Sequence, residues 1–224
     1  MNNFVKRQIR TMCLLLAAIV LLAGAGAYVH WLNSYEYLSQ PMEATDEDLT
    51  QAAMVYKRLA ADAGAKLRTG AADDVGERVE CVFTGMPSPE TAQKLIDVLL
   101  EKQLHAVFFI SEAEAEQYQD SIALLLQNDF EIGLLGDGVN TAFNEEDANA
   151  LVEQLCRATV KIRSRYGVRC RQVLVTSAPA TNGLRAAMAC GVDEVLVSDN
   201  TLALTDCGSV EAAAEKLAAY PRGS

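Results

Sequence analysis

The stretch of sequence that decides the fold is residues 79–111, VECVFTGMPSPETAQKLIDVLLEKQLHAVFFIS. Its two ends, Val79–Thr84 and His105–Ser111, are short and mostly apolar runs, which are typical of buried strands. Between them, Ser88 followed by Pro89 is a preferred helix start, because serine caps the first turn and proline fits the first helical position. The apolar residues after that start recur at helical spacing. The stretch therefore predicts a strand, a helix and a second strand.

The same alternation continues along the chain. Three further apolar runs predict strands at Phe130–Leu135, Gln172–Thr176 and Glu194–Ser198. Helical spacing predicts helices over Ala115–Leu125, from a cap at Asn144 to near Gly167, over Asn182–Cys190 and over Ser209–Tyr220. Strands that alternate with helices and are apolar along their whole length are typical of a parallel sheet covered by helices. We therefore expect an α/β fold whose sheet is either open or closed into a barrel.

Charge and composition restrict the classes of function. The 224 residues include 19 Lys and Arg against 30 Asp and Glu, for a net charge of −11, and half of them are hydrophobic. This composition excludes a wholly disordered chain. The excess of acid disfavours binding to a phosphate backbone, so we expect no nucleic-acid partner. The two histidines are too few for most histidine-rich metal sites.

The N-terminal part of the chain predicts a membrane anchor. Residues 11–32 contain no acidic or basic side chain apart from one histidine, and about 20 helical residues are enough to cross an apolar bilayer core of about 30 Å. Residues 1–10 carry three basic side chains and no acidic one, which favours a cytoplasmic tail. We therefore expect a single-pass protein of the cell membrane with its body outside the cytoplasm. A cleaved signal peptide is the alternative, because the small residues at 23–27 resemble a cleavage site.

The next segment, residues 33–78, predicts a stalk. Thr45 followed by three acidic residues is a typical helix start, and apolar residues then recur at helical spacing up to Gly64. Residues 69–76 predict a linker. The expected order is a cytoplasmic tail (1–10), a transmembrane signal-anchor (11–32), a stalk helix and linker that pack on the body (33–78), and the body itself (79–224).

The body resembles the NodB-homology polysaccharide deacetylases. Residues 83–89 read FTGMPSP where that family has FDDGPSP, and residues 106–110, AVFFI, are similar to its ATFFV strand. Residues 130–133 read FEIG in place of HEIG, and residues 191–199 resemble the GYxxVxWSxD segment. The resemblance covers roughly residues 79–221 and implies a deformed (β/α) barrel. The sequence stops where the family's last strand would begin, so we expect a barrel that is incomplete at its C-terminus.

The same resemblance marks where this sequence departs from the family. Thr84 and Gly85 occupy the positions of two family aspartates, one a catalytic base and one a metal ligand. Leu135 and Val139 occupy the positions of two metal-binding histidines, and Val197 replaces a tryptophan. The family norm is a divalent metal such as zinc. Because these positions lack its ligands, we expect no catalytic residue, no metal and no cofactor here.

The chemistry of metal-assisted hydrolysis shows why these losses matter. A catalytic zinc typically takes three protein donors with N, O or S atoms, and a leucine or valine side chain has none. Asp137 and Asp199 are the candidates for a remodelled site, although Asp137 lies between two glycines and is also a typical turn residue. His105 begins a predicted strand and His30 lies in the predicted anchor, so neither is expected to replace the missing imidazoles.

The cysteines that follow the anchor are open to two interpretations. An extracytoplasmic location permits disulfides, and positions along the predicted elements allow two pairs, Cys156 with Cys170 and Cys190 with Cys207. Alternatively, all five thiols that follow the anchor, including Cys81, are small buried apolar groups. No Cys-x-x-Cys sequence occurs, so neither a zinc ribbon nor a thioredoxin-like site is predicted.

Two functional classes remain. The first is a membrane-anchored, deacetylase-like pseudoenzyme that binds cell-wall glycan or another envelope protein. The second is an active N-deacetylase of peptidoglycan or chitin-type carbohydrate, a hydrolase of non-peptide C–N bonds with an atypical site. The missing metal donors favour the first class.

Overall fold

The computed structural model of the chain describes residues 21, 23–28, 42–69, 80–136, 147–197 and 204–218. The chain divides into two units, residues 1–41 and residues 42–224. In the first unit, residues 23–28 are helical. Among the residues that the structure describes, no helix is long and apolar enough to cross a membrane. The predicted tail and most of the predicted anchor lie outside the described residues.

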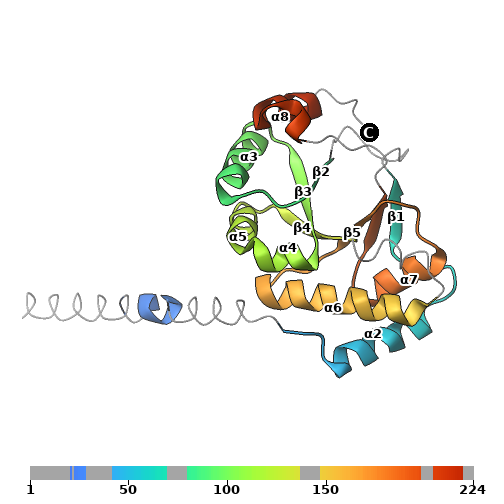
Figure 1. Cartoon of the computed structure of the whole chain (residues 1–224). Coiled ribbons are helices and arrows are strands. Elements are labelled where there is room, and N and C mark those ends of the chain that lie inside the picture. The colour runs from blue at the N-terminus through green and yellow to red at the C-terminus, as the bar shows by residue number, and fades with distance from the viewer. Residues whose placement is uncertain are drawn as a thin grey trace, which may run out of the picture. The chain divides into compact units, whose positions relative to one another are not determined.

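The second unit alternates strands and helices along the chain (Figure 1). Its elements are, in chain order, α2 (Asp46–Arg58), β1 (Lys66–Thr69), β2 (Glu80–Thr84), α3 (Pro89–Glu101), β3 (His105–Ile110), α4 (Glu112–Gln117), α5 (Gln119–Gln127), β4 (Glu131–Leu135), α6 (Ala148–Tyr166), β5 (Gln172–Val175), α7 (Thr181–Ala189), β6 (Glu194–Val197), the 3₁₀ helix η2 (Leu204–Cys207) and α8 (Val210–Ala218).

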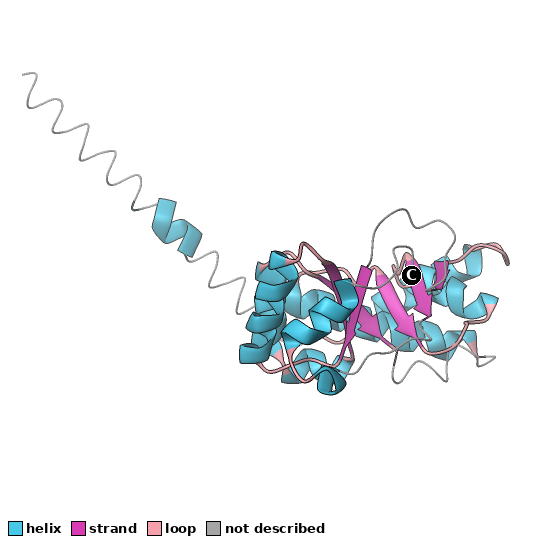
Figure 2. Ribbon diagram, turned by 90° about the horizontal axis from the view of Figure 1, so that it is seen from above, coloured by secondary structure: helices cyan, strands magenta, loops and turns pink. Residues whose placement is uncertain are grey.

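Six parallel strands form one sheet in the order β1-β6-β5-β4-β3-β2. Neighbouring helices contact one another in the order α8, α3, α5, α4, α6 and α7. They therefore form a continuous row of helices beside the sheet (Figures 1 and 2). Strands β1 and β2 are the two edges of the sheet within the described residues. The predicted α/β fold with a parallel sheet is therefore confirmed, in the form of a half-barrel.

Strand β1 lies before residue 79 in the sequence and adds to the sheet of the body. It pairs with β6 from Lys66 opposite Glu194 to Thr69 opposite Val197, so it belongs to the sheet of the body. The backbone N–H of Ala65 also donates to the carbonyl of Leu184, 2.9 Å away. Four residues with two basic side chains give little apolar signal, which is why the sequence pattern did not indicate this strand. Its position also fills the outer edge of β6, where the resemblance implied an incomplete sheet.

Helix α2 confirms the prediction that the segment before the linker packs on the body. Its start is a capping box, in which the Thr45 hydroxyl accepts from the Asp48 N–H and the Asp48 carboxylate accepts from the Thr45 N–H. The helix packs on α6 and α7. Arg185 of α7 donates to the Tyr56 and Leu59 carbonyls at the end of α2 and stacks over the Tyr56 ring.

Local signals explain the other helix boundaries. Ser88 caps α3 with Pro89 in its first turn, as predicted. Gly167 ends α6 in the left-handed conformation, also as predicted. The predicted helix over Ala115–Leu125 is two helices, because the backbone at Tyr118 leaves helical geometry between α4 and α5. The cap of α6 is Asp147, which accepts from two backbone N–H groups; the predicted cap, Asn144, lies outside the described residues.

Apolar residues gather on both faces of the sheet. The larger cluster lies between the sheet and the helices and includes the stacked rings of Phe83 and Phe108. The smaller cluster lies on the opposite, concave face and consists of Val107, Phe109, Leu174 and Leu196, with Leu135 packed against them. Both faces of the central strands are therefore buried, which explains their continuous apolar runs.

Candidate functional site

The carboxyl ends of the strands form the edge where a site is expected in a parallel α/β sheet. Thr84 is the last residue of β2 and Leu135 is the last residue of β4, and β3 lies between them in the sheet. Gly85 follows β2 directly. Because all six strands run in one direction, the three positions lie at the same edge.

The loop after β2 forms the exposed part of this edge. Thr84 and Gly85 are both exposed, and Gly85 has φ +80°, in the left-handed region that glycine tolerates best. Met86 is buried directly after them. The Ser121 hydroxyl of α5 donates to the Pro87 carbonyl, 2.8 Å away, and holds the far side of the loop. We call the edge of the sheet that carries Thr84, Gly85 and Leu135 the mouth of the site. On the side of β2, its exposed residues supply backbone and the Thr84 hydroxyl group.

Glu114 of α4 supports the same loop from the next strand–helix connection. Its Oε1 accepts from the Met86 backbone N–H at 3.0 Å, and its Oε2 accepts from the N–H and the hydroxyl of Ser111, both at 2.8 Å. Glu114 does not belong to any of the sequence motifs that predicted the site. The sequence pattern that could have identified it is a capping box, in which Ser111 is followed three residues later by Glu114.

Leu135 belongs to the apolar floor beneath the mouth. It is partly buried and packs against the concave cluster that contains Phe109 and Leu174. The Phe109 ring lies so close to Gly133 that a Cβ at that position would be only 2.6 Å from the ring's Cδ1. The floor is therefore made of hydrocarbon and closely packed.

A polar group occupies the opposite edge of the sheet. Arg68 of β1 donates to the Glu194 carboxylate at 3.0 Å, and Gln172 of β5 donates to the same oxygen at 3.1 Å. Burial alone would raise the pKa of Glu194, but these two hydrogen bonds together with the positive charges of Arg68 and Lys66 hold the pKa below its ordinary value. The group lies at the amino ends of β5 and β6 and ties β1 to the sheet, so its function is structural.

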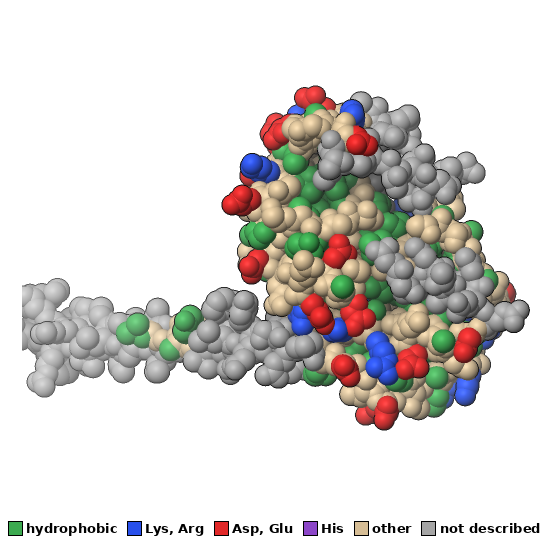
Figure 3. Space-filling view, viewed as in Figure 1, with side chains coloured by type: hydrophobic (Ala, Val, Ile, Leu, Met, Phe, Trp, Pro, Cys, Tyr) green, Lys and Arg blue, Asp and Glu red, His purple; other side chains and the backbone are tan. Residues whose placement is uncertain are grey.

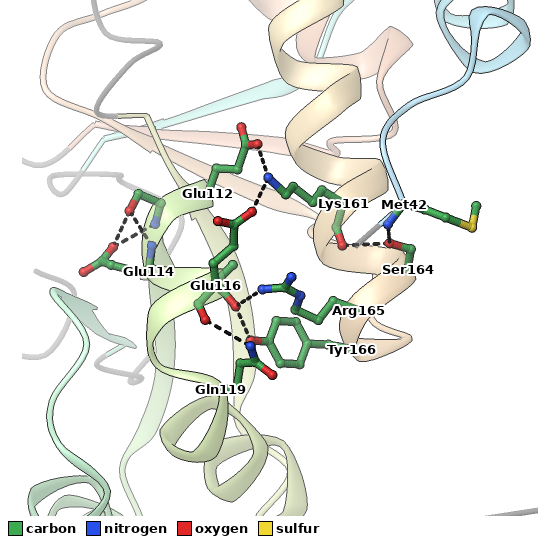
Figure 4. Close-up of polar contacts among 11 residues, drawn as sticks. Met42, Glu112, Glu114, Glu116, Gln119, Lys161, Ser164, Arg165 and Tyr166 are labelled. Carbon is green, nitrogen blue, oxygen red and sulfur yellow. Dashed lines mark hydrogen bonds and ion pairs between the residues drawn. The ribbon is translucent and has the colours of Figure 1, made fainter. Parts of the chain in front are cut away.

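A second polar group fixes the helix that carries Glu114. Lys161 of α6 forms ion pairs with Glu112 and Glu116, which lie one turn apart on α4 (Figure 4). Arg165 and Tyr166, at the end of α6, both donate to the Ala115 carbonyl. Burial raises the pKa of Tyr166 to about 12, so its hydroxyl stays a donor at neutral pH. Helix α4 is thus held on α6, and Glu114 is held at the mouth.

The structure brings together a cysteine pair that the sequence did not predict. The Cys190 thiol donates to the Val152 carbonyl at 3.3 Å, one helical turn before Cys156 on α6. Cys170 is deeply buried, and burial raises its pKa to about 12. The Cys207 sulfur accepts from the Lys216 ammonium. The predicted pairs Cys156 with Cys170 and Cys190 with Cys207 are therefore not the arrangement in the structure.

The sequence of the chain matches a known protein family. The model of the family described as polysaccharide deacetylase matches residues 73–189, which is just over half of the chain. The chain belongs to the polysaccharide deacetylase family. No curated protein matches the chain.

Several solved structures of such deacetylases and their pseudoenzyme relatives are similar to the chain. One is a mutant of BA3943, a CE4 family pseudoenzyme with restored enzymatic activity, with 12% identity over 63% of this chain and 62% of that chain and a TM-score of 0.49. The wild-type pseudoenzyme, from Bacillus anthracis, has 11% identity over 54% of this chain and 43% of that chain and a TM-score of 0.47. A mutant of the peptidoglycan deacetylase PdaC from Bacillus subtilis has 18% identity over 63% of this chain and 82% of that chain and a TM-score of 0.46. The chain thus spans 62% of the length of the first of these.

The polysaccharide deacetylase resemblance implies a divalent metal, and the residues described at the mouth do not fit one. Thr84 offers a neutral hydroxyl, Gly85 has no side chain, and Leu135 is apolar. Among the described ranges, no group of three or more His, Cys, Asp or Glu side chains is arranged to hold a metal ion. Val139, Asp137 and Asp199 lie outside those ranges, so the candidate remodelled site stays a prediction.

The histidine that lies in the described part of the deacetylase domain is far from the mouth. His105 begins β3 and is exposed, as the sequence predicted. Five residue steps of about 3.3 Å separate it from the carboxyl end of the strand, a distance of about 16 Å. It therefore cannot replace an imidazole at the end of β4. His30 lies outside the described residues.

Proposed function

We propose that this protein is a non-catalytic polysaccharide deacetylase-like protein that binds cell-wall glycan on the outer face of the membrane. The observation that carries the proposal is the set of side chains at the carboxyl edge of the sheet. Thr84, Gly85 and Leu135 stand where the family resemblance implies two carboxylates and an imidazole. Hydrolysis of an amide by the family route needs a metal and a carboxylate base, and these positions supply neither.

The physical character of the mouth supports binding of a neutral sugar chain. Its rim is exposed at Thr84 and Gly85, and the Thr84 hydroxyl suits hydrogen bonds with the hydroxyl groups of a glycan. The acidic chain disfavours anionic polymers. On the face shown in Figure 3, acidic and basic side chains of the described residues are intermingled, without a continuous basic surface.

Metal analysis combined with an activity assay tests the absence of catalysis. The full-length protein, purified in detergent, is incubated with excess zinc or cobalt, desalted and analysed for bound metal, and acetate release from chitooligosaccharide and peptidoglycan is measured. We expect neither stoichiometric metal nor acetate. Bound metal together with acetate release that disappears in Asp137→Asn or Asp199→Asn would instead establish an active N-deacetylase with a rebuilt site.

Co-sedimentation with insoluble peptidoglycan or chitin tests the binding part of the proposal. Thr84→Arg places a long side chain at the mouth, and Thr50→Arg makes the same kind of change on the exposed face of α2. We expect the first variant to lose binding and the second to retain it. If the wild-type protein does not bind either glycan, an envelope protein is the remaining partner class.

The location is a separate part of the proposal, and it rests on the sequence of residues 1–32. Protease added to intact protoplasts should digest the body and leave a small membrane-held fragment. Protection of the body in intact cells, with digestion only after lysis, would place it in the cytoplasm.

A further inference from the structure

Two cysteine side chains meet where α6 packs on α7. Cys156 lies in the middle of α6, and Cys190 is the residue at which α7 ends. The Cys190 thiol donates to the Val152 carbonyl at 3.3 Å. Val152 precedes Cys156 by one helical turn, so the Cys190 sulfur lies against the turn of α6 that carries Cys156.

The two thiols differ in accessibility and in ionisation. Cys156 is 5% exposed, whereas Cys190 is partly exposed. The hydrogen bond with Cys190 lowers the pKa of Cys156, while the same contact and burial raise the pKa of Cys190. Cys156 is therefore the thiol that ionises more readily.

We propose that Cys156 and Cys190 form a disulfide bond that fastens α6 to α7. The inference rests on the proposed extracytoplasmic location of the body, because disulfides form and persist in oxidising compartments. Neither sequence-predicted pair has comparable support. Cys170 lies at 1% exposure before β5, and Cys207 lies in η2 beside Lys216.

The chemistry is a thiol–disulfide exchange with an external disulfide, R–S–S–R. One of the two cysteines attacks, as its thiolate, one sulfur of the reagent, which forms a mixed disulfide and releases one thiolate, RS⁻. The thiolate of the other cysteine then attacks the protein sulfur of the mixed disulfide, forms the Cys156–Cys190 bond and releases the second RS⁻. The two cysteines lose two electrons and two protons, and the reagent is reduced to two thiols.

The disulfide would place a covalent constraint across the contact between α6 and α7. Residues 156–190 include β5 and all of α7, and α2 packs on both helices that the bond would join. A closed loop of this length restricts the unfolded chain and so stabilises the folded one. Oxidised protein should therefore unfold at a higher urea concentration than reduced protein.

Mass spectrometry of the full-length protein tests the proposal directly. The protein is isolated from cells whose free thiols have been blocked with iodoacetamide before lysis, and a second sample is oxidised in detergent with glutathione disulfide. Trypsin leaves Cys190 and Cys207 in one peptide, from residue 186 to Lys216, so a second cleavage after Glu194 is needed to separate them. We expect a cross-linked peptide that joins Cys156 to Cys190 and disappears on reduction.

Two outcomes would overturn the inference. One is a Cys156–Cys170 or Cys190–Cys207 cross-link, and the other is complete alkylation of Cys156 and Cys190 in the oxidised sample. The Cys156→Ala/Cys190→Ala variant provides the stability control: reductant should lower the urea midpoint of the wild-type protein and leave that of the variant unchanged. Cys170→Ala should keep the reductant effect. A failure of glycan binding would leave these results unaffected, so the two proposals fail separately.

Discussion

The Glu114 carboxylate accepts a hydrogen bond from the backbone N–H of Met86 at 3.0 Å. This contact joins the first turn of α4 to the loop that follows β2. The other oxygen of the same carboxylate accepts from the N–H and hydroxyl of Ser111, which ends the connection from β3. A single side chain therefore fixes the relative position of two neighbouring loops at the mouth of the sheet.

Glu114→Gln should destabilise the protein. An amide has one accepting oxygen, so it can keep either the Met86 bond or the Ser111 bonds, and its NH₂ group faces donors on the other side. Loss of such hydrogen bonds at a partly buried site costs about 1–3 kcal/mol. Urea denaturation measures the change, with Glu43→Gln at an exposed position as the matched control. Equal midpoints for the two variants would show that Glu114 does not hold the mouth.

Gly85 provides a test of the backbone at the position of a family aspartate. With φ +80°, an alanine there would be strained, and the left-handed conformation costs an L-residue about 1–2 kcal/mol. Space is not the reason, because an added Cβ would meet no atom within 4 Å. We expect Gly85→Ala to lower the free energy of unfolding by about that amount. Gly85→Asn should cost less, because asparagine adopts this conformation more readily. An alanine variant as stable as the wild type would contradict the assigned conformation.

Much of the fold was predictable because its signals are local. The Ser88–Pro89 helix start and the Gly167 stop are short-range patterns, and the strands β3 to β6 are mostly apolar because both of their faces are covered. Strand β1 was not predictable in this way. Its sequence is mostly polar, and its partner β6 lies more than a hundred residues further along the chain.

The site was predictable to the same extent and for the same reason. Parallel strands place Thr84 and Leu135 at one edge, so the sequence order alone located the mouth. The role of Glu114 depends on a contact with the loop that follows β2. Periodic patterns in the sequence do not indicate such a tertiary contact. The Cys156–Cys190 contact likewise depends on which faces of α6 and α7 meet.

The position of β1 predicts where the folded body begins. A fragment of residues 42–224 should unfold cooperatively in urea, because it retains α2 and the strand that pairs with β6. A fragment of residues 79–224 should be poorly soluble or unfold at a lower urea concentration, because the outer edge of β6 would be unpaired. Residues 60–224 keep β1 without α2 and separate the two contributions. Equal stability of 79–224 and 42–224 would show that β1 is dispensable.

The ion pairs of Lys161 predict a pH dependence of stability. Hydrogen bonds with Glu112 and Glu116 raise the pKa of Lys161 above its ordinary value of 10.5, and the hydrogen bond from Lys161 lowers the pKa of Glu116 below 4.5. A raised lysine pKa contributes stability that is complete below pH 10.5 and is lost as the pH rises through the folded-state pKa. A lowered glutamate pKa contributes stability that is complete above pH 4.5 and is lost as the pH falls through the folded-state pKa.

Lys161→Met removes both contributions while keeping an apolar side chain of similar length against α4. The free energy of unfolding of the wild type should therefore exceed that of the variant between about pH 4.5 and 10.5, and the difference should shrink outside this range. Salt should reduce the difference as well, because both glutamates are about half exposed. Lys94→Met, at an exposed position of α3, should leave the pH profile nearly unchanged. Urea denaturation at a series of pH values measures all three proteins, and a difference that persists unchanged at pH 3 would show that Lys161 acts through packing and not through its charge.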